Sequence, residues 1–110
     1  MKYIEHISEL KFDGALSADG DLQVEKLFDG PFRTLLHIRM RAGATLTKHK
    51  AAEHITVLCL AGEGVFRAGA DLEDSQQMTQ GTLITLGPEI EHEAEAVGGL
   101  QLLVTKFKSS

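Results

Sequence analysis

The fold is indicated by two stretches of the chain, GATLTKHKAAEHITVLCLAG at residues 43–62 and GTLITLGPEIEHEAEAV at residues 81–97. Both stretches contain short runs of apolar or β-branched residues that begin or end at glycine. Such runs favour strands, and glycine and proline are typical of the turns between them. The two stretches therefore predict short strands joined by tight turns.

Strand-like runs continue through the rest of the chain, each bounded by Gly, Pro or Asp. They cover residues 21–28, 33–41, 44–50, 55–60, 64–69, 81–86, 89–97 and 100–107. Helix signals are weak, and the best of them, ISEL at residues 7–10, supports a turn or two at most. Residues 68–80 contain few apolar side chains and are expected to form a surface hairpin. Regularly spaced short strands predict an all-β sandwich or barrel.

The length and charge of the chain limit its class. A chain of 110 residues suits one domain, in which we expect a barrel core at about residues 32–107 and an N-terminal extension at residues 1–31. The net charge is −5 and the basic residues are scattered, which argues against nucleic acid as a partner. No apolar run approaches the ~20 residues of a membrane span, so we expect no membrane partner and a cytoplasmic location.

The single cysteine is expected to be structural. Cys59 lies in the apolar run ITVLCL at residues 55–60. A lone cysteine cannot form an intramolecular disulfide or a CxxC site, and its neighbours supply neither a base nor a positive charge. We therefore expect Cys59 to be a small buried hydrophobe.

The alternation of residue types predicts which histidines face the interior. In EIEHEAEAV, residues 89–97, glutamates alternate with Ile90, His92 and two alanines, so one face is acidic and the other is apolar apart from one imidazole. His92 is therefore expected to point inward, together with Ile90. In RTLLHIRMR, residues 33–41, His37 lies on the face opposite the apolar one and is expected outside the pocket.

The first stretch resembles the first conserved motif of the cupin superfamily. That motif reads Gly, five residues, His, any residue, His, three or four residues, Glu, six residues, Gly. Gly43, His49 and Gly62 match it. Ala51 stands at the position of the second histidine and Ile55 at that of the glutamate, so two of the motif's three metal ligands are replaced.

The second stretch resembles the second cupin motif, which reads Gly, five residues, Pro, any residue, Gly, two residues, His, three residues, Asn. Gly81 and His92 match it, whereas Gly87, Glu89 and Ala96 stand at the Pro, Gly and Asn positions. The two motifs occur in the family's order, and the gap from Gly62 to Gly81 is at least as long as the family requires, which makes the resemblance specific.

The resemblance implies an all-β fold, the cupin double-stranded β-helix. This is a jelly-roll barrel of two antiparallel sheets with little helix. It also implies a pocket at one end of the barrel, to which His49, His92, Ala51 and Ile55 contribute.

Cupins hold a divalent ion, such as Fe, Mn, Ni or Zn, between imidazole and carboxylate groups of facing strands. Three protein ligands are the usual minimum. If this chain binds such an ion, His49 and His92 are expected to be joined by Glu53 or His54, which lie just before the strand at residues 55–60.

Three classes of function follow. The replaced ligands favour a small-molecule-binding barrel whose catalytic residues, if any, are unknown. The alternative is a metal-dependent dioxygenase, isomerase or lyase acting on a small substrate, which would be anionic if Lys48, Lys50, Arg39 and Arg41 ring the pocket mouth. A structural or interaction module without a ligand is the third class, and retention of two histidines at ligand positions argues against it.

The chain is also expected to form a homodimer. The strands at residues 55–60 and 100–107 are apolar on both faces. A small barrel buries only one face of each strand, so the other face is available to a second copy.

Overall fold

The computed structural model describes residues 2–12 and 21–108, and within these ranges the only regular structure is β-strand. The strands are β1 (Leu22–Asp29), β2 (Arg33–Met40), β3 (Thr45–His49), β4 (His54–Ala68), β5 (Asp74–Met78), β6 (Leu83–Leu86) and β7 (His92–Phe107). All pairs are antiparallel. No helix in these ranges is long and apolar enough to cross a membrane.

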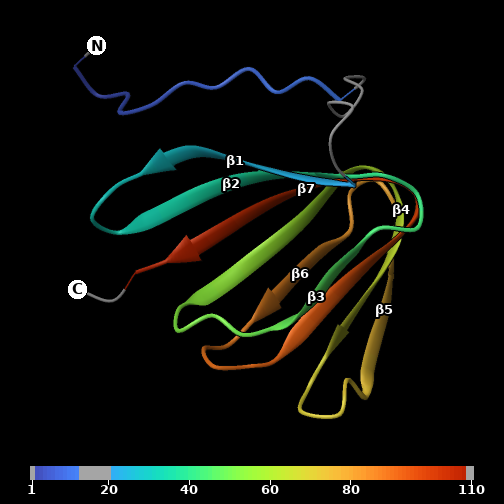
Figure 1. The fold of residues 1–110 in the computed structure, drawn as a ribbon. Coiled ribbons are helices and arrows are strands. Elements are labelled where there is room, and N and C mark those ends of the chain that lie inside the picture. The colour runs from blue at the N-terminus through green and yellow to red at the C-terminus, as the bar shows by residue number, and fades with distance from the viewer. Residues whose placement is uncertain (1, 13–20, 109–110) are drawn as a thin grey trace.

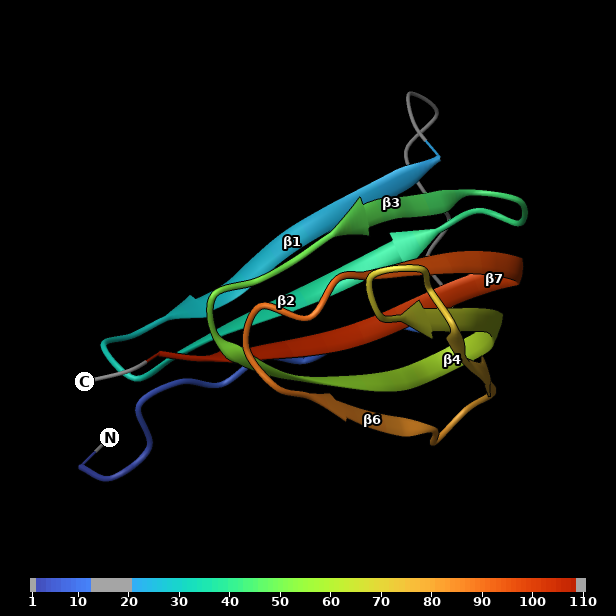
Figure 2. The same ribbon diagram turned by 90° about the horizontal axis from the view of Figure 1, so that it is seen from below.

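Two long, bent strands, β4 and β7, divide the structure into two layers. The first layer contains, in spatial order, β1, β2, the second half of β7, the first half of β4 and β6. In the second layer, β3 pairs with the first half of β7, which pairs with the second half of β4 and then β5. Figure 1 shows both long strands turning at the right-hand edge, so that the layers diverge toward the left. Figure 2, seen from below, places β1 and β3 on one side and β6 on the other, with β4 and β7 between them.

The bends explain why the sequence predicts two strands where the structure has one. The predicted strands at residues 55–60 and 64–69 are the two halves of β4, whose register with β7 shifts between Cys59 and Gly64. The strands predicted at residues 89–97 and 100–107 are likewise the halves of β7, with the second starting after Gly98-Gly99. Glycine permits the close approach of two backbones at such a corner.

The expected surface hairpin at residues 68–80 contains the strand β5, which pairs with β4 from Ala68 to Gly64. The core lies between the layers, and its largest fully buried side chains include Met78, Leu100 and Leu102. Cys59 belongs to this core, where burial raises the pKa of its thiol. A buried thiol of this kind is a small hydrophobe rather than a nucleophile.

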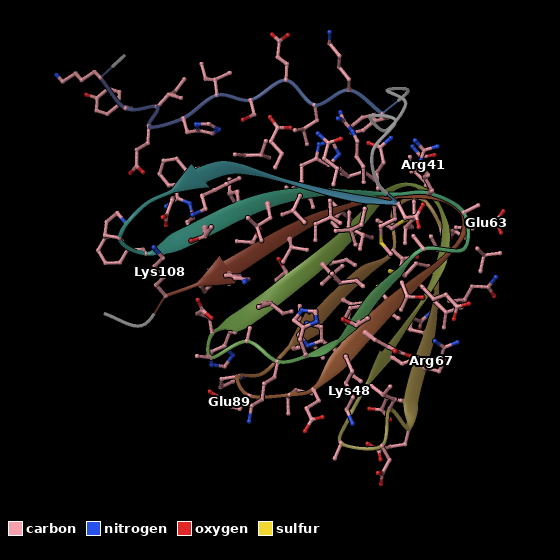
Figure 3. All side chains as sticks on the ribbon, in the orientation of Figure 1. Arg41, Lys48, Glu63, Arg67, Glu89 and Lys108 are labelled. Carbon is pink, nitrogen blue, oxygen red and sulfur yellow. The ribbon has the colours of Figure 1, made fainter. Side chains whose placement is uncertain are left out.

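One residue of the predicted inward face is placed differently. Ile90 was expected to point inward with His92, but β7 begins at His92 and the side chain of Ile90 is 39% exposed. The reason is local, because Glu89 adopts a left-handed backbone conformation with φ of 62° and ends the strand-like alternation. The outer glutamates that follow, Glu93 and Glu95, bind Arg67 at 3.0 and 3.2 Å, on the outer side that Figure 3 shows.

The N-terminal part of the chain contributes to both faces of the first layer. β1 falls in the segment expected to be an extension, yet it pairs along β2 and places Val24 against the interior. Residues 2–12 run along the outside of this layer (Figure 1). Arg39 donates to the carbonyl of Lys11 there, and the buried Gln101 donates to the carbonyl of Phe12.

His37 lies beneath this segment. Its side chain points away from the interior, as the sequence predicts, but is only 2% exposed. Its Nε2 lies 2.9 Å from Oε1 of Gln101, and an amide oxygen accepts, so Nε2 carries a proton. His37 is therefore a buried, hydrogen-bonded histidine of the outer face.

Candidate functional site

A cavity of about 190 Å³ lies between the two layers at the end where they diverge. Most of its wall is apolar and comes from β1, β2, β3, β4, β7 and the loop between β3 and β4. The apolar lining residues are Val24, Leu36, Ile38, Leu46, Ala51, Ile55, Val57, Phe66, Leu102 and Val104. Three ionisable side chains complete the lining, namely His49, His92 and Lys106. The volume is below the ~300 Å³ typical of drug-sized ligand sites, so the cavity suits a smaller molecule.

The two histidines form a pair across neighbouring strands. His49 ends β3, His92 begins β7, and the two residues are register partners. Their ring centroids are 4.3 Å apart at an interplanar angle of 61°, an edge-to-face arrangement. Pairing between two strands thus brings together side chains that are distant in the sequence.

Hydrogen bonds to the backbone fix the proton position on both rings. Nδ1 of His49 lies 2.7 Å from the carbonyl oxygen of Thr47, and Nδ1 of His92 lies 2.9 Å from that of Ile90. A carbonyl oxygen only accepts, so Nδ1 is the protonated nitrogen in each case. The neutral form of either ring therefore has an unprotonated Nε2 that accepts a proton or a hydrogen bond.

The environments of the two rings differ. His92 is 4% exposed and stacks on Phe66 with centroids 5.6 Å apart, whereas His49 is exposed at the mouth. Burial lowers the pKa of His92, against the raising effect of its bond to the Ile90 carbonyl, and electrostatic interaction with His49 and Lys106 lowers that pKa further. His92 is consequently a neutral hydrogen-bond acceptor at pH 7.

Lys106 is a site residue that the sequence analysis did not single out. It lies on the second half of β7, and the bend of that strand brings it to the same cavity as His92 at the other end. A signal was present, because Leu102, Val104 and Lys106 alternate along one face. Because both faces of the segment at residues 100–107 carry apolar residues, the sequence does not show which face lines the interior.

The structure brings together some of the residues expected in the pocket and leaves others apart. His49, His92, Ala51 and Ile55 all line the cavity. Glu53 is half-buried and His54 is exposed, and neither lines it. Among residues 2–12 and 21–108, no three His, Cys, Asp or Glu side chains are grouped so that they could hold a metal ion. The ligand set therefore does not fit the three-ligand metal centre that the resemblance implies.

The basic residues considered for the pocket mouth have other partners. Lys48 and Lys50 form ion pairs with Glu91 and Glu89 at 3.0 and 3.5 Å. Figure 3 shows Lys48 and Glu89 in the lower half of the view, and neither residue lines the cavity. Arg39 lies on the outer face, where it binds the Lys11 carbonyl. Lys106 is the basic side chain that lines the cavity instead.

A second, more open cleft of about 410 Å³ lies between β5 and β6 and shares Phe66 with the cavity. Glu73, Asp74 and polar side chains of β5 line much of it, and no histidine does. Of these two sites, the smaller cavity is the one that combines imidazoles with an enclosed, largely apolar wall.

Comparison with known proteins identifies the fold. No family model matches the sequence, and no curated protein matches it. An RmlC-like cupin protein from Desulfovibrio desulfuricans superposes with a TM-score of 0.78 and 20% identity, covering 90% of this chain and 93% of that one. An RmlC-like cupin family protein from Methanocaldococcus jannaschii, with a double-stranded β-helix fold, superposes with a TM-score of 0.70 and 16% identity. The match covers 91% of this chain and 93% of that one.

A conserved protein of unknown function from Streptococcus pyogenes is similar to this chain over nearly the full length of both proteins. It superposes with a TM-score of 0.76 and 15% identity over 98% of each chain. The protein thus has the cupin fold, the all-β double-stranded β-helix of RmlC-like proteins, as its two motifs predicted. At these identities the likeness establishes the fold, and function has to be argued from the site.

Proposed function

We propose that this protein binds a small, largely apolar molecule in the cavity and that the histidine pair orients it. The observation that carries the proposal is that Nδ1 bonds to backbone carbonyls fix both rings in the lining of an apolar cavity, with His92 buried and His49 exposed. Imidazoles held in this way are preorganised, so a ligand does not have to order them on binding. Apolar walls with a few fixed polar groups are typical of small-molecule sites.

The same geometry supports proton transfer without a metal. The neutral His92 accepts a proton at Nε2, and the Nδ1 bond to the Ile90 carbonyl stabilises the cation that results. The exposed His49 beside it connects the ring to solvent. Binding is the proposed function, and acid–base chemistry on the bound molecule is a capacity that these two residues supply.

The proposal is tested by a fragment screen followed by protein NMR. The screen uses compact fragments of similar size that are neutral, anionic or cationic, and binding is located by the resonances that shift. We expect the fragments that bind to shift His49, His92 and the methyl groups of Ile55 and Val104.

Two variants locate the binding. Ala51→Phe fills the cavity from its wall and should abolish these shifts, whereas His54→Ala removes a histidine outside the cavity and should leave them unchanged. Backbone spectra of both variants report whether the fold is retained. Fragments that still bind to a folded Ala51→Phe protein, or that shift only the β5–β6 cleft, would contradict the proposal.

A further inference from the structure

We infer that the molecule bound in the cavity is a small hydroxycarboxylate, with its carboxylate on Lys106 and its hydroxyl donating to His92. The inference rests on the proposed function and adds the class of ligand. It follows from three observations about charge and hydrogen bonding in the cavity, of which the first two concern the carboxylate of the ligand and the third concerns its hydroxyl group.

The first observation is that the charge of the cavity is opposite to that of the protein. The chain has sixteen acidic and eleven basic residues. None of the acidic residues in the described part of the chain lines the cavity, whereas the cationic Lys106 does, and the other ionisable groups of the lining are the imidazoles of His49 and His92. A basic cavity in an acidic protein selects for anions, because the protein supplies no competing carboxylate inside it.

The second observation is that Lys106 has no ion-pair partner among residues 2–12 and 21–108. Lys48, Lys50 and Lys108 each bind a carboxylate at the surface. Lys106 is instead half-buried on an apolar wall beside Ile55, its register partner on β4. A partly desolvated cation is unfavourable without a counter-charge, and a ligand carboxylate in the cavity provides one.

The third observation concerns the other end of the ligand. Because Nδ1 of His92 donates to the Ile90 carbonyl, Nε2 of the neutral ring can only accept. A second carboxylate oxygen would meet an acceptor there, whereas a hydroxyl would donate to it. His92 and Lys106 come from opposite ends of β7 and from different layers, so the two polar groups of the ligand are separated by an apolar body.

The positive charge of Lys106 also interacts electrostatically with His92, and this interaction contributes to lowering the pKa of the imidazole. Because His92 and Lys106 line the same cavity, a single ligand can contact both side chains. The cavity volume of about 190 Å³ limits the apolar body to roughly one small ring or a short branched chain.

The test compares 4-hydroxybenzoate with 4-hydroxybenzamide, which keeps the ring and the hydroxyl but has no charge. Dissociation constants are measured by NMR titration at pH 7.5 and low salt. We expect the acid to bind the native protein about ten-fold or more tightly than the amide, since a charge-assisted bond to Lys106 forms only with the acid. Benzoate, which lacks the hydroxyl, should bind several-fold more weakly than 4-hydroxybenzoate.

Lys106→Met keeps the length and apolar stem of the side chain and removes its charge. In this variant the acid should bind no more tightly than the amide. Lys106→Arg should retain the preference for the acid, and so should Lys108→Met, which removes a neighbouring lysine that binds Asp29 outside the cavity.

The outcomes separate this inference from the proposed function. Equal affinity of the acid and the amide at the cavity, or a preference for the acid that persists in Lys106→Met, would overturn the role of Lys106 and leave small-molecule binding intact. Equal affinity of benzoate and 4-hydroxybenzoate would overturn the hydroxyl contact with His92. If no probe shifted His49, His92 or the cavity methyl groups, the result would contradict the proposed function itself.

Discussion

Gly62 and Gly99 meet at the corner where β4 and β7 bend together. Gly62 has a φ of +86°, and a Cβ placed on it would lie 1.5 Å from the carbonyl oxygen of Gly99. Position 62 therefore requires glycine for two reasons, the left-handed backbone conformation and the lack of room for a Cβ atom. This gives a structural reason for the last glycine of the first cupin motif, because the bend joins the two layers and sets the position of the cavity between them.

Replacing Gly62 with alanine should strongly destabilise the protein. The left-handed conformation and the overlap with a backbone atom should together lower the free energy of unfolding by about 2 kcal/mol or more. Gly87→Ala is the matched control, because a Cβ at Gly87 would meet nothing within 4 Å. Urea unfolding measures both variants. Equal midpoints for Gly62→Ala and Gly87→Ala would show that the corner does not have the described geometry.

Glu89 stands at a glycine position of the second cupin motif, and its φ of 62° explains that preference. Glu89→Gly should stabilise the protein by about 1 kcal/mol, because glycine adopts the left-handed conformation without the steric cost of a Cβ. The exposed ion pair with Lys50 that is lost at the same time contributes little.

Glu89→Gln separates the two effects, since it removes the charge and keeps the backbone cost. Its melting temperature should remain close to that of the native protein, while that of Glu89→Gly should rise. A Glu89→Gly protein that melts at or below the temperature of Glu89→Gln would argue against strain at this position.

The sequence predicts the all-β fold and the inward position of His92 because both depend on local patterns. Period-two alternation decides which face of a strand is buried, and glycine spacing marks the turns. Ile90 was placed wrongly because alternation alone does not reveal that Glu89 turns the backbone. The buried state of His37 was equally hidden, since it depends on residues 2–12 covering an outer face, a contact between distant segments.

The composition of the cavity could be predicted only in part. His49 and His92 stand in recognisable motifs, but Lys106 lies fourteen positions after His92 on a strand that looks like two. Its presence at the site follows from the bend of β7, which is a property of the tertiary fold. The homodimer remains a prediction, and the outer side of the first layer, where Leu83 is 62% exposed beside the half-buried Leu58, is the face concerned.

Restoring the two missing ligands should create a metal site. Ala51 and Ile55 line the cavity at the positions where the cupin motif has histidine and glutamate. The double variant Ala51→His, Ile55→Glu should bind Zn²⁺ or Ni²⁺ at one ion per chain, because the two new ligands and the two native histidines, His49 and His92, together supply four donors. Elemental analysis after dialysis measures the content, and the native protein should retain less than one ion per chain.

A control distinguishes the cavity from the loop. Adding His92→Ala to the double variant should reduce the bound metal, whereas adding His54→Ala should not, because His54 is outside the cavity. Stoichiometric metal in the native protein that survives His92→Ala would show that the ion is held elsewhere in the chain.

His92 should make the stability of the protein depend on pH in a defined direction. Its pKa in the folded protein is lowered from the usual 6.5, chiefly by burial, so the unfolded chain takes up a proton at a higher pH than the folded protein does. The free energy of unfolding should therefore decrease as the pH falls through about 6.5, continue to decrease until the folded-state pKa is reached, and then level off. Above pH 7 the residue should contribute no pH dependence.

The measurement is urea unfolding at half-unit steps from pH 7.5 to pH 5 at constant ionic strength, with the native protein beside two variants. His92→Gln keeps a polar side chain of similar size and cannot be protonated, so its stability should fall less steeply than that of the native protein over this range. His54→Gln removes an exposed histidine outside the cavity and should leave the slope of the native protein unchanged. If His92→Gln instead kept the full native slope, the proton uptake would belong to another group, and His92 would not be the neutral acceptor on which the proposed orientation of the ligand depends.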